Sequence, residues 1–192
     1  PGGRAGIPQH LADAKAAEVF GLSDTIAVAV VTTDGSSVFT PKVLTLVDEL
    51  SAELAGLPNI RYDRVASLAS ESSISGENGS VFIDPYVEPF AMDDAFANDS
   101  RARWEKMAPH RGTLVSEDGT GAVIMAELID SDMADETYLA VLEMVDAITM
   151  DDVDLHVAGP GAVSGFLSRY IDEDARKLQP LVFVLVLGFI YL

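Results

Sequence analysis

Residues 25–68 read TIAVAVVTTDGSSVFTPKVLTLVDELSAELAGLPNIRYDRVASL and predict a strand, a helix and a second strand in succession. Residues 25–32 are β-branched or small and apolar, which is typical of a strand covered on at least one face. Asp34-Gly35 follows with turn chemistry. Residues 60–68 alternate in part between apolar and polar side chains, so they predict a half-buried strand. Together these segments form one β-α-β unit.

A strong helix start stands between the two strands, at Thr40-Pro41. A threonine hydroxyl can cap free backbone N–H groups, and proline at the first helical position gives up no hydrogen bond. Apolar residues follow at three- and four-residue spacing: Val43, Leu46, Val47, Leu50, Leu54 and Leu57. This spacing predicts an amphipathic helix with one buried stripe, closed by Gly56 and Pro58.

A looser copy of the same unit occupies residues 122–158. Residues 112–129 predict a hairpin, because two apolar runs flank a turn that contains Asp118-Gly119. A helix should follow, capped by Ser131 or Asp132. Its apolar stripe is Ala134, Tyr138, Val141, Leu142, Val145 and Ile148. Residues 153–158, VDLHVA, alternate as a strand does, and a Gly-Pro-Gly sequence ends it.

Two β-α-β units with right-handed crossovers build one sheet with both helices on the same face. We therefore predict an α+β fold, a ferredoxin-like βαββαβ sandwich. Residues from about 69 to 111 are then an insertion between the two halves. Within the insertion, the serine- and glycine-rich residues 69–80 predict a flexible loop, and residues 92–107 predict a helix.

The insertion is rich in large apolar side chains for a segment outside the sheet: Tyr86, Phe90, Met92, Phe96 and Trp104. Two interpretations of these five residues stay open. The side chains can pack the insertion onto the domain. Alternatively, they can form the apolar wall of a substrate path or a contact with a neighbouring subdomain.

Residues 180–192, PLVFVLVLGFIYL, contain no charged side chain and follow the highly charged residues 171–177, IDEDARK. A spanning helix needs ~20 apolar residues, so this run is too short to cross a bilayer by itself. It lacks both the turn that follows a core strand and the polar face of a core helix. We predict the truncated start of a transmembrane helix here, with a buried terminal strand or helix as the alternative.

The charge balance excludes one class of partner. The chain carries 31 acidic and 12 basic side chains, a net charge of −19, so a phosphate backbone would be repelled over most of the surface. Nucleic acid is therefore not an expected partner. Cysteine is absent, which excludes disulfides, thiolate metal sites and a cysteine nucleophile.

The sequence contains no recognisable catalytic or cofactor motif. The three histidines, His10, His110 and His156, form no HExxH motif and no close pair, so we expect no metal site. The aspartates near His156 do not follow the pattern of an EF-hand loop. No serine lies in GxSxG or SxxK, and the glycines lack Walker A and GxGxxG spacing. We expect no cofactor and no enzymatic activity.

The order of these features resembles the first extracytoplasmic loop of RND-superfamily exporters of the MMPL and Patched-like branch. The resemblance covers nearly all of residues 7–192. It runs through a leading helix that ends at Phe20-Gly21, the strand-to-helix passage of residues 34–60 and the hairpin GTLVSEDGTGAVIMAEL. It closes with VAGPGAVSGFLSRYI, residues 157–171, which leads into the apolar run. Each motif is common by itself, and their order is what makes the resemblance specific.

The resemblance implies a porter domain at residues 7–179 that stands outside the inner (plasma) membrane, followed by a transmembrane helix from residue 180. Its partners would be membrane lipid and the rest of the transporter, namely the transmembrane bundle and a second porter domain. A homo-oligomer is compatible with this assignment. The substrates would be hydrophobic or amphipathic molecules such as lipids. The alternatives are a membrane-anchored extracytoplasmic binding or sensing module and, as a distant third, a soluble ferredoxin-like enzyme.

Overall fold

The computed structural model describes residues 24–77, 80–89, 92–107 and 112–162. The predicted leading helix at residues 7–20, the predicted transmembrane segment at residues 180–192 and Phe90 lie outside these ranges. Within them, no helix combines the length and the apolar character that a membrane crossing needs.

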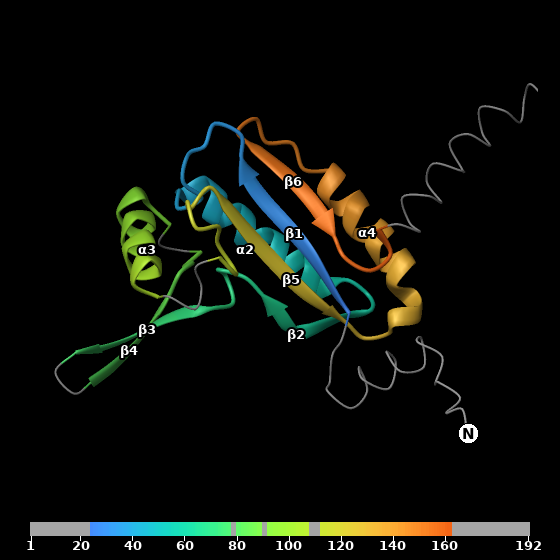
Figure 1. Ribbon diagram of the computed structural model, residues 1–192, viewed down its shortest axis with the longest axis horizontal. Coiled ribbons are helices and arrows are strands. Elements are labelled where there is room, and N and C mark those ends of the chain that lie inside the picture. Colours follow the sequence, from blue (N-terminus) through green and yellow to red (C-terminus); the bar gives the residue numbers. More distant parts are fainter. Residues whose placement is uncertain (1–23, 78–79, 90–91, 108–111, 163–192) are drawn as a thin grey trace, which may run out of the picture.

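A four-stranded antiparallel sheet forms the centre of the described chain (Figure 1). Its strands are β1 (Thr25–Thr32), β2 (Ile60–Ala66), β5 (Gly121–Leu128) and β6 (Val153–Ala158). Their spatial order is β2-β5-β1-β6, with β1 paired to both β5 and β6 and with β5 paired to β2. Both predicted β-α-β units therefore contribute to one sheet, and the fold is α+β as predicted.

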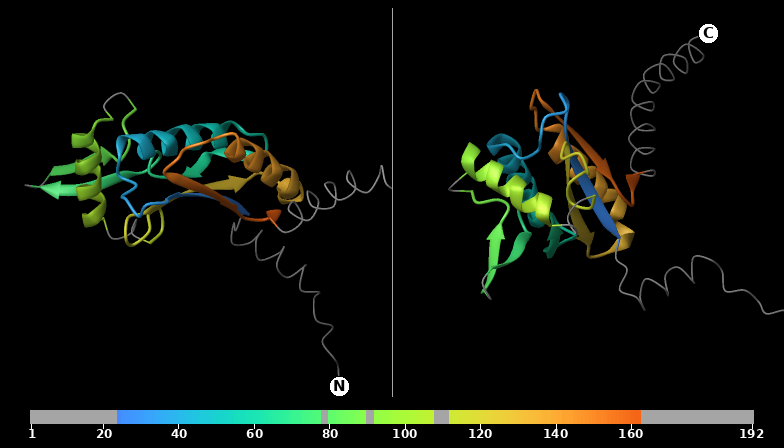
Figure 2. Two further views of the ribbon diagram at one scale, coloured as in Figure 1. Left: turned by 90° about the horizontal axis from the view of Figure 1, so that it is seen from above. Right: turned by 60° about the vertical axis from the view of Figure 1, so that its left-hand side comes forward.

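Two helices, α2 (Pro41–Gly56) and α4 (Ala134–Asp146), cover the same face of this sheet (Figure 2, left). The start of α2 is the predicted one, because the Thr40 hydroxyl accepts a hydrogen bond of 3.3 Å from the Val43 N–H. The start of α4 differs from the prediction. The side chain of Asp130 caps a short 3-10 turn, η2 (Ser131–Met133), and α4 itself has no side-chain cap.

The hydrophobic core lies between the sheet and the two helices. Alternate residues of β1, namely Ile26, Val28 and Val30, are fully buried. The matching residues of β5 and the helix stripes complete the core: Ala122, Ile124, Ala126, Leu128, Val43, Leu46, Val47, Leu50, Leu54, Tyr138, Val141 and Val145. Burial of each large side chain contributes about 1.5–3 kcal/mol to folding, so this shared core holds both units together.

The predicted hairpin at residues 112–129 forms only in part. Val115 makes a single antiparallel bridge to Ala122, and the strand partners of β5 are β1 and β2. The turn itself is built as expected, because Gly119 has φ 75°, a value that favours glycine. The Ser116 hydroxyl donates to Asp118 at 2.6 Å, and this hydrogen bond holds the pKa of Asp118 below its ordinary value.

The insertion departs most from the prediction. Residues that were expected to be a flexible loop form strand β3 (Ser72–Glu77), which pairs with β4 (Ser80–Pro85) in a separate two-stranded sheet. This hairpin projects from the body of the molecule (Figure 1). The predicted helix is present as α3 (Asp94–Lys106), capped by the Asp93 carboxylate, which accepts from the Phe96 N–H at 2.8 Å.

Asn59 links the two halves of the sheet. Its φ of 68° lies in the left-handed region, which asparagine tolerates better than most residues. Its side-chain amide donates to the Asp130 carbonyl and to the Thr137 hydroxyl, both at 2.9 Å, and its amide oxygen accepts from the Asp130 N–H at 2.7 Å. One side chain therefore connects the start of β2 to the segment that enters α4.

Candidate functional site

The inserted arm, β3, β4 and α3, contains the residues that the sequence singled out. Tyr86 and Trp104 are buried, whereas Met92 and Phe96 are only partly buried. Phe90 lies outside the described residues. Tyr86 and Trp104 pack the arm onto the domain, so a contact with substrate or with a neighbouring subdomain would use the more exposed members of the set.

Trp104 is the anchor of the arm. Its ring lies 5.3 Å from the ring of Phe39, measured between centroids, with the planes tilted by 38°. Gly119 lies beside the same indole, since a Cβ at this glycine would be 3.7 Å from two of its ring carbons. Tilted aromatic pairs of this kind add about 0.5–1.5 kcal/mol beyond the area they bury. The tryptophan thus joins α3 to two neighbouring loops, the one after β1 and the one before β5, which are hydrogen-bonded to each other through the Val38 N–H and the Gly119 carbonyl.

Arg103 is the polar centre of the arm. Its guanidinium is paired with Asp99, one helical turn earlier, and donates to the Pro85 carbonyl and the Ser100 hydroxyl, both at 2.8 Å. The guanidinium carbon lies 5.3 Å from the centroid of the Phe96 ring, a cation–π distance. The Ser100 hydroxyl donates in turn to the Tyr86 carbonyl at 2.9 Å. These bonds fasten the end of β4 to α3.

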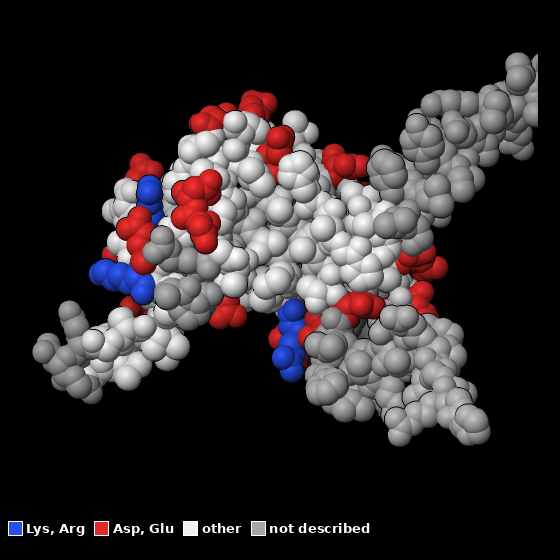
Figure 3. All heavy atoms as spheres, viewed as in Figure 1, with Lys and Arg blue, Asp and Glu red and all other residues white. Residues whose placement is uncertain are grey.

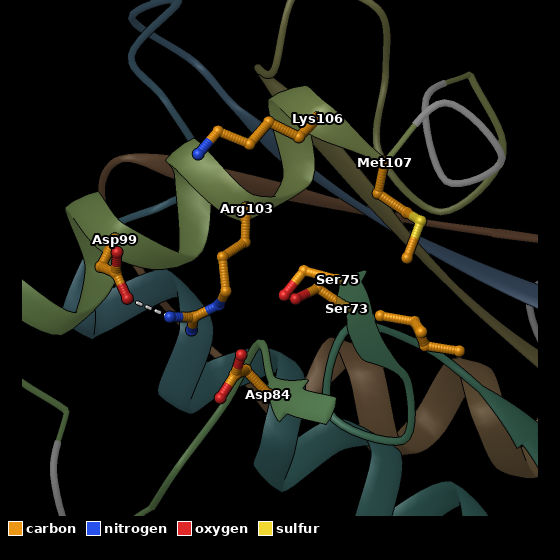
Figure 4. Close-up of a pocket in the computed structure, with 8 residues that line it drawn as sticks. Ser73, Ser75, Asp84, Asp99, Arg103, Lys106 and Met107 are labelled. Carbon is orange, nitrogen blue, oxygen red and sulfur yellow. Dashed lines mark hydrogen bonds and ion pairs between the residues drawn. The ribbon is translucent and has the colours of Figure 1, made fainter. Parts of the chain in front are cut away.

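A pocket of about 280 Å³ opens between the hairpin and α3. Figure 4 shows the Arg103 guanidinium between Asp99 and Asp84, with the hydroxyls of Ser73 and Ser75 facing it across the pocket. The remaining lining residues are Ile74, Lys106 and Met107. The pocket wall therefore mixes two acidic, two basic and two hydroxyl side chains with an apolar rim.

The Nε of Arg103 is buried and has no hydrogen-bond partner among the described residues. A buried N–H donor without a partner costs free energy, roughly 1–3 kcal/mol for a lost hydrogen bond. The guanidinium as a whole is nevertheless well paired, with three other bonds satisfied. Of the four charged side chains that line the pocket, Arg103 and Asp99 form an ion pair, and the lining as a whole carries two acidic and two basic groups.

The pocket holds two serine hydroxyls and two carboxylates, which are groups that a nucleophilic site can use. No histidine lines the pocket, and neither serine hydroxyl is hydrogen-bonded to the carboxylate of Asp84 or Asp99, so the described residues show no serine already paired with a general base. Within the described ranges, no three His, Asp or Glu side chains come close enough to hold a metal ion. His156 lies exposed on β6, away from the arm.

Burial raises the pKa of the Tyr86 phenol above its ordinary value of about 10. The positive charge of Arg103 opposes this shift in pKa, and the negative charge of Glu71 adds to it more weakly. The neutral phenol is thus favoured in the folded state. The stability that this shift contributes to the folded chain is fully present below the pKa of Tyr86 in the unfolded chain. It is lost as the pH rises through the pKa of Tyr86 in the folded chain.

We therefore expect the free energy of unfolding to fall less steeply above pH ~10 in Tyr86→Phe than in the parent chain. Urea unfolding at a series of alkaline pH values measures this difference. Tyr62→Phe is the matched control, because Tyr62 is 80% exposed and its loss removes no buried phenol. Parallel alkaline curves for the parent chain and Tyr86→Phe would contradict the expectation.

The sequence did not single out Arg103, Ser100 or the pocket serines. One local signal was available: Asp99 and Arg103 stand four residues apart on a predicted helix, a spacing that favours an ion pair. The bond from Arg103 to the Pro85 carbonyl spans 18 residues and depends on how the hairpin meets α3. Only the tertiary structure brings those groups together.

No protein-family model matches this chain, and no curated protein matches it. The resemblance to RND-type exporters therefore depends on the order of sequence features alone.

Proposed function

We propose that this chain is the extracytoplasmic porter domain of an RND-type exporter of the MMPL and Patched-like branch. It would take part in moving hydrophobic or amphipathic molecules such as lipids. The observation that carries the proposal is the strand order β2-β5-β1-β6, with both helices on one face of the sheet (Figure 2). Along the chain, the arm is inserted between β2 and β5. That arrangement agrees with the porter-domain layout that the sequence resemblance implies.

The finer fold assignment belongs to the same proposal. When the four central strands β1, β2, β5 and β6 are counted 1 to 4 along the chain, their order across the sheet is 2-3-1-4. Every pair of neighbouring strands is antiparallel. A βαββαβ chain with right-handed crossovers gives this order, which supports a ferredoxin-like sandwich. Under the proposal, residues 69–111 are the element inserted into that sandwich.

Under the proposal, the arm has a binding role and not a catalytic one. Its pocket offers hydroxyls, paired charges and an apolar rim, which suit reversible contact with an amphipathic molecule. The domain would act together with the transmembrane bundle and a second porter domain in the inner (plasma) membrane. Its strongly acidic surface, with a net charge of −19, is consistent with partners other than nucleic acid.

The absence of cysteine from the sequence allows a clean test of the extracytoplasmic location. In cells that carry the gene encoding this chain, Tyr62→Cys places one thiol at an 80% exposed position, and Ile129→Cys places one at a 67% exposed position. We expect a membrane-impermeant maleimide to label both variants in intact cells. Labelling that appears only after lysis would overturn the proposal.

Transport is tested separately by deleting the same gene and measuring the release of labelled lipid and of an amphipathic dye. Reduced release that the intact gene restores supports the exporter. Normal release, with an outward-facing domain and a signalling region encoded after Leu192, would instead support an extracytoplasmic sensing module.

A further inference from the structure

The β3–β4 hairpin carries an unusual concentration of exposed apolar side chains. Eight large apolar residues are exposed in the described part of the chain, and four of them lie on this hairpin. The exposed fractions are 62% for Ile74, 71% for Val81, 47% for Phe82 and 67% for Ile83. Large clustered apolar exposure on a folded domain commonly marks an interaction surface.

The strand register sorts these residues onto two faces. Ile74 is paired with Ile83, and Gly76 with Val81, so one face of the hairpin is apolar along most of its length. Ser73, Ser75, Phe82 and Asp84 alternate with them on the other face. That second face contributes Ser73, Ser75 and Asp84 to the pocket beside α3. Of the apolar face, only Ile74 also lines the pocket, so Val81 and Ile83 are left without a partner inside the described chain.

The backbone of the hairpin is also incompletely paired. β3 and β4 form a sheet of two strands, so each has one edge with no neighbouring strand in the described part of the chain. An isolated two-stranded hairpin is marginally stable in water, and an exposed apolar edge strand is a template for pairing with another strand. A third strand would stabilise this element.

We propose that β4 pairs with β4 of a second copy of this chain, antiparallel and centred on Phe82. In this register Val81 of one copy faces Ile83 of the other, and Asp84 faces Ser80, so no two carboxylates are opposed. Pro85 has no N–H to donate, which limits the pairing to the residues before it. The two apolar faces then join into one continuous surface across a two-fold axis.

The charge distribution favours a second copy at this position. Acidic side chains, drawn in red, are scattered over the visible side of the body, whereas the described atoms on the visible face of the hairpin are mostly white (Figure 3). With a net charge of −19 per chain, two copies repel each other least where they meet at a projection that keeps the bodies apart. The hairpin is such a projection (Figure 1), and its two acidic residues, Glu77 and Asp84, stand toward the ends of the strands, where the proposed register opposes neither of them to an acidic residue.

A lipid surface is the less favoured occupant. Peripheral segments that bind membranes usually combine apolar residues with lysine or arginine, and neither β3 nor β4 contains a basic residue. Four side chains cover less than the ~800 Å² per partner of a stable interface, so the dimer should be weak. We expect dissociation in the micromolar range or above.

Disulfide trapping tests the register directly. The full chain is kept in mild detergent at about 100 µM, a concentration suited to a weak dimer. In the proposed register, Phe82→Cys places two thiols opposite each other at the centre of the paired strands. Such a position allows a disulfide, which requires Cα atoms within roughly 7 Å. We expect Phe82→Cys to form covalent dimers on mild oxidation, whereas Tyr62→Cys, exposed on β2, does not. Equal cross-linking of both variants, or none, would overturn the proposal.

A charge substitution provides the second measurement. Ile83→Glu opposes the new carboxylate to the apolar surface of the partner, so sedimentation should show at least a tenfold weaker association. Ile129→Glu is the matched control, because Ile129 has the same 67% exposure but lies after β5. An equal effect of both substitutions would overturn the pairing. Ile83-dependent binding to neutral phosphatidylcholine vesicles by a monomeric chain would also overturn it, in favour of a lipid partner.

Discussion

Gly159→Ala is expected to destabilise the fold by roughly 3–5 kcal/mol, the sum of a strained backbone conformation and an overpacked contact. Gly159 has φ 144°, which L side chains rarely adopt. A Cβ at this position would stand 2.8 Å from the Thr25 carbonyl oxygen and 2.9 Å from the Ile26 Cα. Both atoms belong to the backbone of a central strand, so neither can move aside as a flexible side chain would.

Urea unfolding of the two chains measures this loss, and Gly56→Ala is the control. Gly56 ends α2 and does not have a positive φ, and a Cβ added there would meet no atom within 4 Å. Alanine there should stabilise the chain by about 0.5–1 kcal/mol, because it restricts the unfolded chain and favours the helix. If Gly159→Ala unfolds at the same urea concentration as the parent chain, the close approach after β6 is not present in solution.

Trp104→Ala should cost roughly 3–5 kcal/mol, the usual range for truncating a large buried aromatic side chain. Trp104 is 3% exposed and packs against Phe39 and beside Gly119, so its removal leaves a cavity between α3 and the body. Because the arm has its own small sheet, we expect the loss to appear first as loosening of α3 and then as reduced global stability.

Limited trypsin digestion separates these two effects. Arg101, Arg103 and Lys106 lie in α3 and become cleavable when the helix detaches from the body. Early cleavage at these residues in Trp104→Ala, before the core unfolds, is the expected pattern. Tyr62→Ala removes an aromatic side chain that is 80% exposed and should change neither measurement. A digestion pattern identical to that of the parent chain would show that Trp104 does not anchor the arm.

Local signals predicted the central elements well. The stripe at Val43, Leu46, Val47 and Leu50 is buried in α2, and the Thr40 cap is where the sequence places it. Buried residues alternate with more exposed ones along β1, as expected for a strand with one covered face. These features depend on residues within one or two turns of each other, so a pattern along the chain contains all the necessary information.

The insertion was predicted less well. Residues 72–77, SSISGE, contain one large apolar side chain and carry serine and glycine that are typical of loops, yet they form β3. A usable signal was present, since Asn78-Gly79 is a preferred dipeptide for a two-residue hairpin turn. The serine and glycine content of residues 69–80 favours a loop and outweighs this single dipeptide.

The candidate site shows the same division. The sequence identifies the large aromatic residues of the arm, but it does not show which of them are buried. Tyr86 is held against α3 by the hydrogen bond from the Ser100 hydroxyl to its carbonyl, and Trp104 packs against Phe39, which precedes α2. A side chain that looks available in the sequence becomes a packing residue once those segments meet.

The sequence by itself determined the type and approximate limits of β1, α2, α3, α4 and β6, together with the acidic surface and the pairing of two similar units. The tertiary structure alone decided three features: that Arg103 meets the Pro85 carbonyl at the end of β4, that Asn59 joins the two units, and that Gly159 passes close to the start of β1. The physical reason is range. Helix periodicity and caps act over a few residues, whereas Asn59 contacts a carbonyl 71 residues away, and no local pattern encodes that distance.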